Sequence, residues 1–253
     1  MDFPRALRAR RTSRHLSQLD LALRAGTTQR HLSFIESGRS VPGRTMVVRL
    51  AESLELPLRE RNELLLAAGY APAYPESSLD GPELAPVRTA IDNILRGHLP
   101  YPALVVDRGG DLIAANEAFD VLTEGAAPEL VGPGRNVYRL ALHPRGLAPR
   151  IANLAEWSRH ILARLGHLPD LRDELRACIP ELEPSADHLG FAVPLHLRSS
   201  YGDLRLMTTV TTFATAVDVT LAELKLEAFL PTDPATQRAL ATAAAHRDVQ
   251  GSR

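Results

Sequence analysis

The sequence of 253 residues contains a single cysteine, Cys178, and a single lysine, Lys225. One cysteine excludes an intramolecular disulfide and a zinc site built from several thiolates. Because Cys178 stands in an apolar stretch with a helical pattern, we expect it to be buried, which argues against a redox sensor. The basic residues are almost all arginine; this bias is typical of genome composition, and it indicates no function.

Long hydrophobic runs are also missing. No window approaches the roughly 18 consecutive apolar residues that a membrane span needs. The N-terminal stretch MDFPRALRARRTSRHL is too charged for a signal peptide. The sequence therefore predicts a soluble cytoplasmic protein with no membrane partner, and its length leaves room for two domains that each bury a core.

The sequence lacks the catalytic motifs HExxH, GxSxG and GxGxxG and the Walker phosphate loop. The stretch VGPGRN at 131–136 is too short to cradle a phosphate, and it predicts a turn. We predict no enzymatic activity, because the side chains that could support it form no recognisable group. They are His143, His160, His167, His188, His196, Glu223 and Glu227.

Two pairs of these residues have a spacing that a metal site could use. His160 and His167 would share one face of a helix, but a glycine between them predicts a break. Glu223 and Glu227 would align on a helix, but the alternation over 221–226 favours a strand. On a strand both carboxylates lie on a polar face that is solvated or forms a dimer contact. We therefore predict no metal site and no cofactor.

Against these absences, residues 17–38 (SQLDLALRAGTTQRHLSFIESG) predict two short amphipathic helices around a glycine turn. This layout is typical of a helix-turn-helix, which lays its second helix into the DNA major groove. Ser17 suits the N-cap of the first helix and Gly26 suits its end. The first helix carries four apolar residues, of which Leu21 is one residue off the stripe: Leu19, Leu21, Ala22 and Leu23.

The second helix has an inner and an outer face. Thr27 or Thr28 can cap it, and its apolar residues Leu32 and Ile35 stand three apart and face the first helix. Glutamine and arginine near its start suit hydrogen bonds to adenine and guanine edges, and a serine or phenylalanine can touch a thymine methyl or a sugar. Gln18, at the start of the preceding helix, can hold a phosphate. The residues predicted to face DNA are Gln29, Arg30, Ser33 and Phe34.

With SQ, LA, AG, IESGR and a following proline in this order, residues 3–70 resemble the phage-repressor and xenobiotic-response-element class of bacterial helix-turn-helix regulators. The resemblance implies that Gln18 contacts the DNA backbone and that Arg39 lies near a phosphate. Phe34 departs from the polar residue of some relatives, so base reading does not carry over to it, although a ring can pack on the backbone. The groove-facing set that the resemblance implies is Thr28, Gln29, Arg30 and Ser33.

Charge is segregated along the chain. Residues 1–50 contain ten arginines against three acids, Asp2, Asp20 and Glu36, whereas the remainder is acidic and the whole chain carries a net charge of −1. A basic end on a nearly neutral chain predicts a surface for a polyanion, with binding that weakens steeply in salt. The alternative is a solvated arginine-rich helix face, which does not account for the helix-turn-helix pattern.

Beyond this motif, apolar residues at helical spacing predict two more helices that close a small bundle. The segment APAYPESSLDGPELAP at 71–86 carries four prolines, so it cannot sustain a helix or a central strand. We therefore predict a helix-turn-helix domain at 1–71, a Pro-rich linker at 72–85 and a second domain at 86–253, which begins with a helix.

The second domain changes its sequence period. Residues 102–116 predict a strand, a Gly-Gly turn and a second strand. Asp218 followed by Thr220 indicates a turn rather than a metal ligand. Two strands, then helices, then three strands predict an α+β domain behind the all-α head. The helical patterns lie at 117–125, 148–166 and 168–178, and the last three strands are predicted at 191–200, 203–216 and 217–231.

The stretches YPALVVDRGGDLIAAN, NVYRLALHP, ANLAEW and MTTVTTFATAVDVTLAELKLEAFLPTD resemble the PAS-like ligand-binding domain of MmyB-type transcription regulators, over about 99–233. In that family a helix-turn-helix of this class precedes the PAS-like domain, and a fatty acid is associated with a member's cavity. The resemblance implies a one-component transcription regulator that senses a small apolar ligand.

Such a cavity needs apolar walls and a few polar groups that fix the ligand's head. Among the polar candidates, Arg139 is the best charge match for a carboxylate, whereas Asn116 is equally suited to an N-cap. The candidate head-group contacts are Asn116, Asn136, Arg139, His143 and Asn153. The candidate wall residues, which are equally ordinary core, are Leu104, Val106, Ile113, Phe119, Leu122, Trp157, Ile161, Met207, Val210 and Phe213.

These predictions describe a homodimer on a palindromic double-stranded DNA operator, because one recognition helix buries too little groove for operator affinity. Two alternatives stay open. In the first, the second domain has a filled core and serves only for dimerisation or protein docking. In the second, the chain is a DNA-tethered enzyme that uses Glu223, Glu227 or His143.

Overall fold

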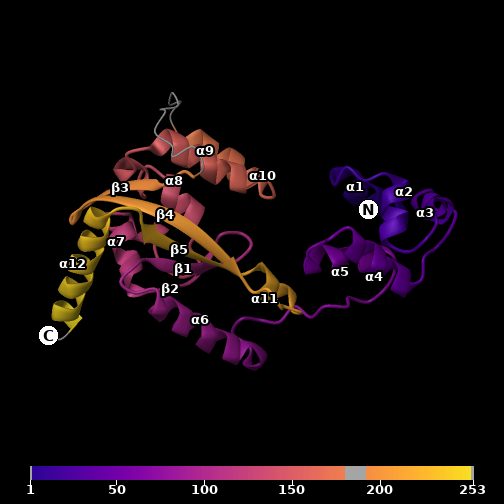
Figure 1. Ribbon diagram of the computed structural model, residues 1–253, viewed down its shortest axis with the longest axis horizontal. Helices are drawn as coiled ribbons and strands as arrows, with labels where there is room; N and C mark the ends of the chain where they lie inside the picture. Colours follow the sequence, from indigo (N-terminus) through magenta and orange to yellow (C-terminus); the bar gives the residue numbers. More distant parts are fainter. Residues whose placement is uncertain (1, 180–191, 252–253) are drawn as a thin grey trace. The chain divides into compact units, whose positions relative to one another are not determined.

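The computed structural model describes residues 2–179 and 192–251, so His188 lies outside the described residues. The chain divides into two compact units (Figure 1). One comprises Met1–Ser78 with Ala214–Ala222, and the other comprises Leu79–Phe213 with Glu223–Arg253. Each unit has its own hydrophobic core, as expected for two separately packed bodies.

The first unit begins with five helices: α1 (Phe3–Ser13), α2 (Gln18–Arg24), α3 (Gln29–Glu36), α4 (Arg44–Ser53) and α5 (Leu58–Ala67). Side chains cap the first three helices, which satisfies backbone N–H groups that have no partner inside a helix. Asp2 caps α1, Ser17 forms a capping box with Asp20 at α2, and Thr28 rather than Thr27 caps α3.

The turn between α2 and α3 requires glycine. Gly26 has a φ of +60°, and a Cβ at this position would overlap the guanidinium of Arg49. Arg49 donates hydrogen bonds to the carbonyl oxygens of Ala25 and Gly26. The backbone thus combines a left-handed conformation with a close side-chain approach, and glycine tolerates both.

The apolar stripe predicted for the first helix is partly wrong. Leu21 is fully buried, whereas Leu19 is 48% exposed and Leu23 is 68% exposed. Ser17 starts the helix at Gln18, and at 3.6 residues per turn the inward face then falls on Leu21, Ala22 and Ala25. Leu32 and Ile35 of α3 are buried as predicted.

The second unit contains an antiparallel five-stranded sheet with the strand order β2-β1-β5-β4-β3. The fold is α+β, as predicted from the order of patterns. The strands are β1 (Ala103–Val106), β2 (Leu112–Ala115), β3 (Leu195–Ser199), β4 (Gly202–Thr212) and β5 (Lys225–Pro231). The helices of this unit are α6 (Ala85–Gly97), α7 (Asp120–Thr123), α8 (Val137–Leu142), α9 (Leu154–Arg164), α10 (Pro169–Cys178) and α12 (Pro234–Gly251).

Helices α8, α9 and α10 lie together on one side of the sheet (Figure 1). One core cluster joins residues of these helices to β1, β3, β4 and β5, and α12 contributes Leu240 and Ala243 to it. Cys178, at the end of α10, is only partly buried, which is less than its apolar setting predicted. Among the described helices, none combines the length and the apolar character that crossing a bilayer would require.

The prediction of one strand over 217–231 is wrong in its first half. This stretch forms helix α11 (Val219–Glu223) and only then β5. Asp218 starts the helix, because its carboxylate accepts a hydrogen bond from the Leu221 N–H at 3.2 Å. A capping hydrogen bond of this kind favours helix over a strand that the alternation alone indicates.

The Pro-rich stretch after α5 is tied to that helix by side-chain hydrogen bonds. The Asn62 side chain accepts from the N–H groups of Ala73 and Tyr74, and it donates to the Tyr74 carbonyl at 2.8 Å. Arg61 lies over the Tyr74 ring and donates to its hydroxyl. This stretch lacks regular secondary structure, but it has defined partners.

The same stretch is held a few residues later by the segment around α11. The Ser77 N–H donates to Asp218 at 3.0 Å, and the Thr220 hydroxyl donates to the Ser77 carbonyl at 2.7 Å. The Val219 N–H donates to the Pro75 carbonyl. Burial opposes ionisation of Asp218, but the hydrogen bonds that its carboxylate accepts from Ser77 and from the backbone of Leu221 and Thr220 outweigh it, so the pKa of Asp218 is lowered.

Candidate DNA-binding surface and ligand cavity

Helix α3 has one buried face and one accessible face. Leu32 and Ile35 lie in the core of the first unit, whereas Gln29 and Arg30 are exposed. Ser33 is partly buried on the same helix. Thr28 uses its hydroxyl to accept from the His31 N–H at 3.1 Å. The accessible face therefore begins at the first turn of α3, where base-reading side chains of a helix-turn-helix lie.

Phe34 organises two arginines on this surface. Its ring lies 5.4 Å from the guanidinium carbon of Arg30 and 6.0 Å from that of Arg39. Cations at such distances are attracted to the face of an aromatic ring. The sequence predicted Phe34 as a DNA contact alone. Its second arrangement, which keeps two positive charges near one patch, was not predicted.

A buried ion pair fixes α3 against the rest of the first unit. The Arg11 guanidinium donates to both oxygens of Glu36, at 2.7 and 2.9 Å, and the Gln18 amide donates to Glu36 at 2.8 Å. Burial opposes ionisation of Glu36, but the hydrogen bonds from Arg11 and Gln18 outweigh it and lower the pKa of Glu36. Gln18 thus bridges α2 and α3, whether or not it also meets a phosphate.

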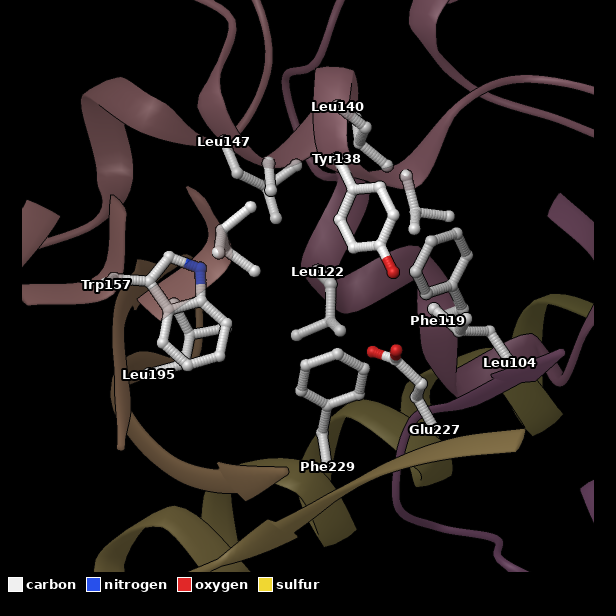
Figure 2. Close-up of a pocket in the computed structure, with 13 residues that line it drawn as sticks. Leu104, Phe119, Leu122, Tyr138, Leu140, Leu147, Trp157, Leu195, Glu227 and Phe229 are labelled. Carbon is white, nitrogen blue, oxygen red and sulfur yellow. The ribbon is translucent and has the colours of Figure 1, made fainter. Parts of the chain in front are cut away.

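The second unit contains a cavity of about 40 Å³ between its helices and the sheet (Figure 2). Its walls are mostly leucine and aromatic side chains from β1, α7, α8, α9, β3 and β5 and from the residues just before α7 and after α8. They are Leu104, Phe119, Leu122, Val137, Tyr138, Leu140, Ala141, Leu147, Trp157, Ile161, Leu195, Glu227 and Phe229. A water molecule needs roughly 10 to 15 Å³ of such space, so the cavity is small in this conformation.

One end of the cavity is polar. In Figure 2 the Glu227 carboxylate points from β5 into the space, and the Tyr138 hydroxyl points toward it from α8. Arg164 of α9 forms an ion pair with Glu227, and its guanidinium carbon lies 5.8 Å from the Tyr138 ring. Burial lowers the pKa of Arg164, but the attraction of Glu227 outweighs it, so the net shift is upward. Burial raises the pKa of Tyr138.

The position of the Tyr138 ring depends on a glycine. Gly110 has a φ of +85°, and a Cβ at this position would overlap the ring. Its carbonyl also accepts from the Val137 N–H at the start of α8, at 2.8 Å. The turn between β1 and β2, which the sequence predicted, therefore also positions a cavity wall.

The burial of Glu227 contradicts the prediction of a solvated sheet face. Glu227 is 5% exposed, and its neighbours Leu226, Ala228 and Phe229 are buried as well. Strand β5 is the middle strand of the sheet, and a central strand that is covered on both faces does not keep the polar-out alternation. Glu223 lies in α11, so the two carboxylates share neither a strand nor a helix face.

Among the predicted head-group contacts, two asparagines serve the fold instead. Asn116 is buried; it accepts from the Ala103 N–H and donates to the carbonyls of Leu95 and Tyr101. Asn153 is buried too. Its side-chain amide donates to the Pro194 carbonyl and accepts from the His196 N–H at the start of β3. Both buried amides are satisfied by backbone groups, and neither asparagine belongs to the described lining of the cavity.

The remaining predicted head-group contacts, Arg139, His143 and Asn136, have other partners. Arg139 is 45% exposed and pairs with Glu174 through two 2.8 Å hydrogen bonds. His143 ends α8 and accepts from the Arg145 N–H. Asn136 caps α8. Half of the ten predicted wall residues line the cavity among the described residues. Those that line it are Leu104, Phe119, Leu122, Trp157 and Ile161, and those that do not are Val106, Ile113, Met207, Val210 and Phe213.

His160 and His167 have partners other than a shared metal site. His160 packs on the Trp157 ring, with centroids 5.5 Å apart, and burial lowers its pKa. His167 lies beyond the end of α9 and contacts the Arg108 carbonyl. Within 2–179 and 192–251, no three His, Cys, Asp or Glu side chains gather in a way that could hold a metal ion.

The described elements define a transcription regulator with a DNA-binding head and a second domain for a ligand. Residues 7–61 match the helix-turn-helix family model, and residues 87–243 match the model of the MmyB-like transcription regulator ligand binding domain. The second match spans more than half of the chain. The chain therefore belongs to the MmyB-like transcription regulators, which confirms both resemblances found in the sequence. No curated protein matches the chain.

Proposed function

We propose that the chain is a cytoplasmic, homodimeric one-component regulator. Its α3 helices bind a palindromic operator, and its PAS-like second domain senses a small apolar molecule, for which the family resemblance alone suggests a fatty acid. The observation that carries this proposal is the cavity, because it lies among core residues of the matched ligand-binding domain and its described lining is apolar or aromatic except for Glu227. Small-molecule sites have this character, with few polar groups that fix orientation.

The DNA-binding part of the proposal is supported by the accessible face of α3 and by the arginine excess of residues 1–50. Gln29 and Arg30 lie exposed in the first turn of α3, where they can meet base edges. Arg39 lies beside Phe34, where it suits a phosphate contact. A dimer would place two such helices roughly 34 Å apart, one helical turn of DNA.

The size of the cavity bears on how a ligand acts. A space of about 40 Å³ holds a few water molecules and not an acyl chain. A ligand of that size requires the walls to move apart, so the ligand-bound domain differs in shape from the one described. A ligand shifts an equilibrium between two arrangements only if it binds one of them more tightly.

The segment 214–222 offers a route for this shape change to reach the linker. It lies between β4 and β5 in the sequence, but it groups with the first unit. Asp218 and the first residues of α11 hydrogen-bond to the stretch at Pro75 and Ser77. Strand β5 starts directly after α11, and its Glu227 lines the cavity. A displacement of β5 therefore also displaces the segment that hydrogen-bonds to the linker.

The DNA-binding surface is tested with alanine variants on operator and random duplexes. We expect Gln29→Ala and Arg30→Ala each to cost about 1–3 kcal/mol of binding at their own base pairs, whereas Arg39→Ala weakens binding to all sequences alike. Titrations of labelled duplexes at fixed salt measure this. Equal losses on operator and random DNA for all three variants would contradict the assignment of the groove.

The ligand is tested by native mass spectrometry of the purified chain, followed by denaturing extraction. A stoichiometric small molecule supports the sensor and names its chemical class. An empty dimer that acyl-chain compounds do not stabilise against heat would favour the alternative of a pure dimerisation module, because a ligand that binds the folded state raises its stability.

A further inference from the structure

The polar end of the cavity presents a hydrogen-bond acceptor. Among the described residues that line the cavity, Glu227 alone is charged. Its carboxylate projects into the space (Figure 2), and its side chain is 6% exposed. Its partner Arg164 is not part of the wall. A molecule in the cavity therefore meets the negative member of the ion pair first.

The carboxylate retains capacity for a further donor. An ionised carboxylate offers about four acceptor sites, and one of its oxygens accepts from Arg164. The Tyr138 hydroxyl, which points toward Glu227 in Figure 2, carries a single proton. Among the described residues, the Arg164 hydrogen bond and the Tyr138 proton thus occupy at most two of about four sites. A donor on a ligand therefore finds an acceptor site that these side chains do not use.

A ligand with a carboxylate head meets the opposite situation. Two carboxylates in an apolar enclosure repel each other, because charges interact strongly where water is excluded. The positive charge of Arg164 is already engaged by Glu227. A fatty acid fits the apolar walls with its tail, but its ionised head does not fit Glu227.

Given the proposed sensor function, on which this inference rests, we infer that the cavity selects molecules with an apolar body and a hydrogen-bond-donating head, a hydroxyl or an amine, over carboxylates. The head binds the Glu227 carboxylate, and the body separates the leucine and aromatic walls. Hydroxyl and amine share this chemistry, and a matched probe series distinguishes them.

The test uses the full chain at pH 7.5 with hexan-1-ol, hexylamine and sodium hexanoate, which share one tail. Trp157 is the sole tryptophan and lines the cavity, so its fluorescence reports occupancy directly. We expect hexan-1-ol or hexylamine to bind at least about tenfold more tightly than hexanoate, since hydrogen bonds to charged groups are worth that much. The tighter of the two identifies the head group.

A variant pair assigns the preference to Glu227. Glu227→Gln keeps the size of the side chain and removes its charge, so we expect hexylamine to lose about tenfold in affinity and hexanoate to gain. The matched control is Glu174→Gln, which removes a carboxylate from an exposed pair with Arg139 in the same unit. The control should leave all three affinities unchanged. If Glu227→Gln does not fold, the comparison of the three probes on the unsubstituted chain decides alone.

The outcomes separate this inference from the proposed function. Tighter binding of hexanoate than of both other probes overturns the inference, while an apolar-ligand sensor stands. Equal effects of Glu227→Gln and Glu174→Gln also overturn it. If no probe changes Trp157 fluorescence and none stabilises the chain against heat, the proposed sensor function falls, and the inference falls with it.

Discussion

Each of the two units buries an arginine–glutamate pair, and the two pairs differ in how completely they are enclosed. In the first unit, Glu36 accepts two hydrogen bonds from Arg11 and one from Gln18, and Arg11 also donates to the Leu16 carbonyl. In the second unit, Glu227 pairs with Arg164 at the wall of a cavity. The first pair holds helices together, whereas the second leaves an acceptor at an internal space.

The difference shows why burial and charge alone do not mark a binding site. Glu36 and Glu227 have side chains that are 3% and 6% exposed, so their burial is nearly equal. The two carboxylates differ in the number of hydrogen bonds that they accept and in whether a cavity lies beside them. A buried pair with every partner in place specifies a packing, and a pair that borders a cavity can respond to a ligand.

The largest expected effect is the loss of the first pair. Glu36→Ala leaves Arg11 buried without its partner, and we expect about 3–5 kcal/mol of destabilisation, as for other broken buried pairs. Urea unfolding followed by far-UV circular dichroism measures it. The matched control is Glu63→Ala, whose carboxylate pairs with Arg10 but is 51% exposed; it should cost about 1 kcal/mol or less. If both variants lose the same free energy of unfolding, the buried pair of Glu36 stabilises the fold no more than an exposed pair does.

The second pair should be less sensitive. Glu227→Ala leaves Arg164 unpaired, but the adjoining cavity can admit water that hydrates it, so we expect about 2 kcal/mol. Trp157 fluorescence during urea unfolding follows this unit. If Glu227→Ala loses as much stability as Glu36→Ala, water does not reach Arg164 through the cavity, and the expected difference between the two pairs is contradicted.

The wall of the cavity can be changed without substituting either residue of the Arg164–Glu227 pair. Gly110→Ala places a methyl group against the Tyr138 ring and keeps a left-handed φ, and we expect about 1–2 kcal/mol of destabilisation. Gly125→Ala is the control, since Gly125 also has a positive φ but a Cβ there meets no atom within 4 Å. If the two variants lose the same stability, backbone strain accounts for the effect, and Tyr138 does not.

The smallest effect is a dependence on pH. The pKa of Glu36 is lower in the folded chain than its ordinary value of 4.5, so its contribution to stability is present above about pH 4.5 and is lost as the pH falls through the folded pKa. The free-energy difference between the unsubstituted chain and Glu36→Gln should be constant near neutral pH and should shrink in acid. A difference that grows in acid would contradict the downward direction of the Glu36 pKa shift.

Much of the fold followed from local patterns. Caps, a glycine turn and helical spacing predicted α2 and α3, and the Gly-Gly turn predicted β1 and β2. One error lies where hydrogen bonds compete with a hydrophobic pattern: the alternation over 217–231 predicted one strand, but Asp218 caps a helix there and also accepts from the distant Ser77 N–H. The C-terminal helix α12, which packs against β4 and β5, was not predicted either.

The candidate sites divide in the same way. The exposed positions of α3 could be predicted, because capping and the burial of Leu32 and Ile35 fix which residues face outward. The polar end of the cavity could not, because Tyr138, Arg164 and Glu227 come from three elements far apart in the sequence. Arg139, chosen for its charge, pairs with Glu174 instead.

The sequence by itself determined the two-part organisation, the helix-turn-helix with its basic end, and the membership of the MmyB-like regulators. These depend on spacing, capping and charge within short stretches, which act locally. Only the tertiary structure decided which carboxylate is enclosed with its partners and which one borders a cavity. The central position of β5 buries Glu227, and no property of the neighbouring residues encodes the helices that cover a strand from both faces.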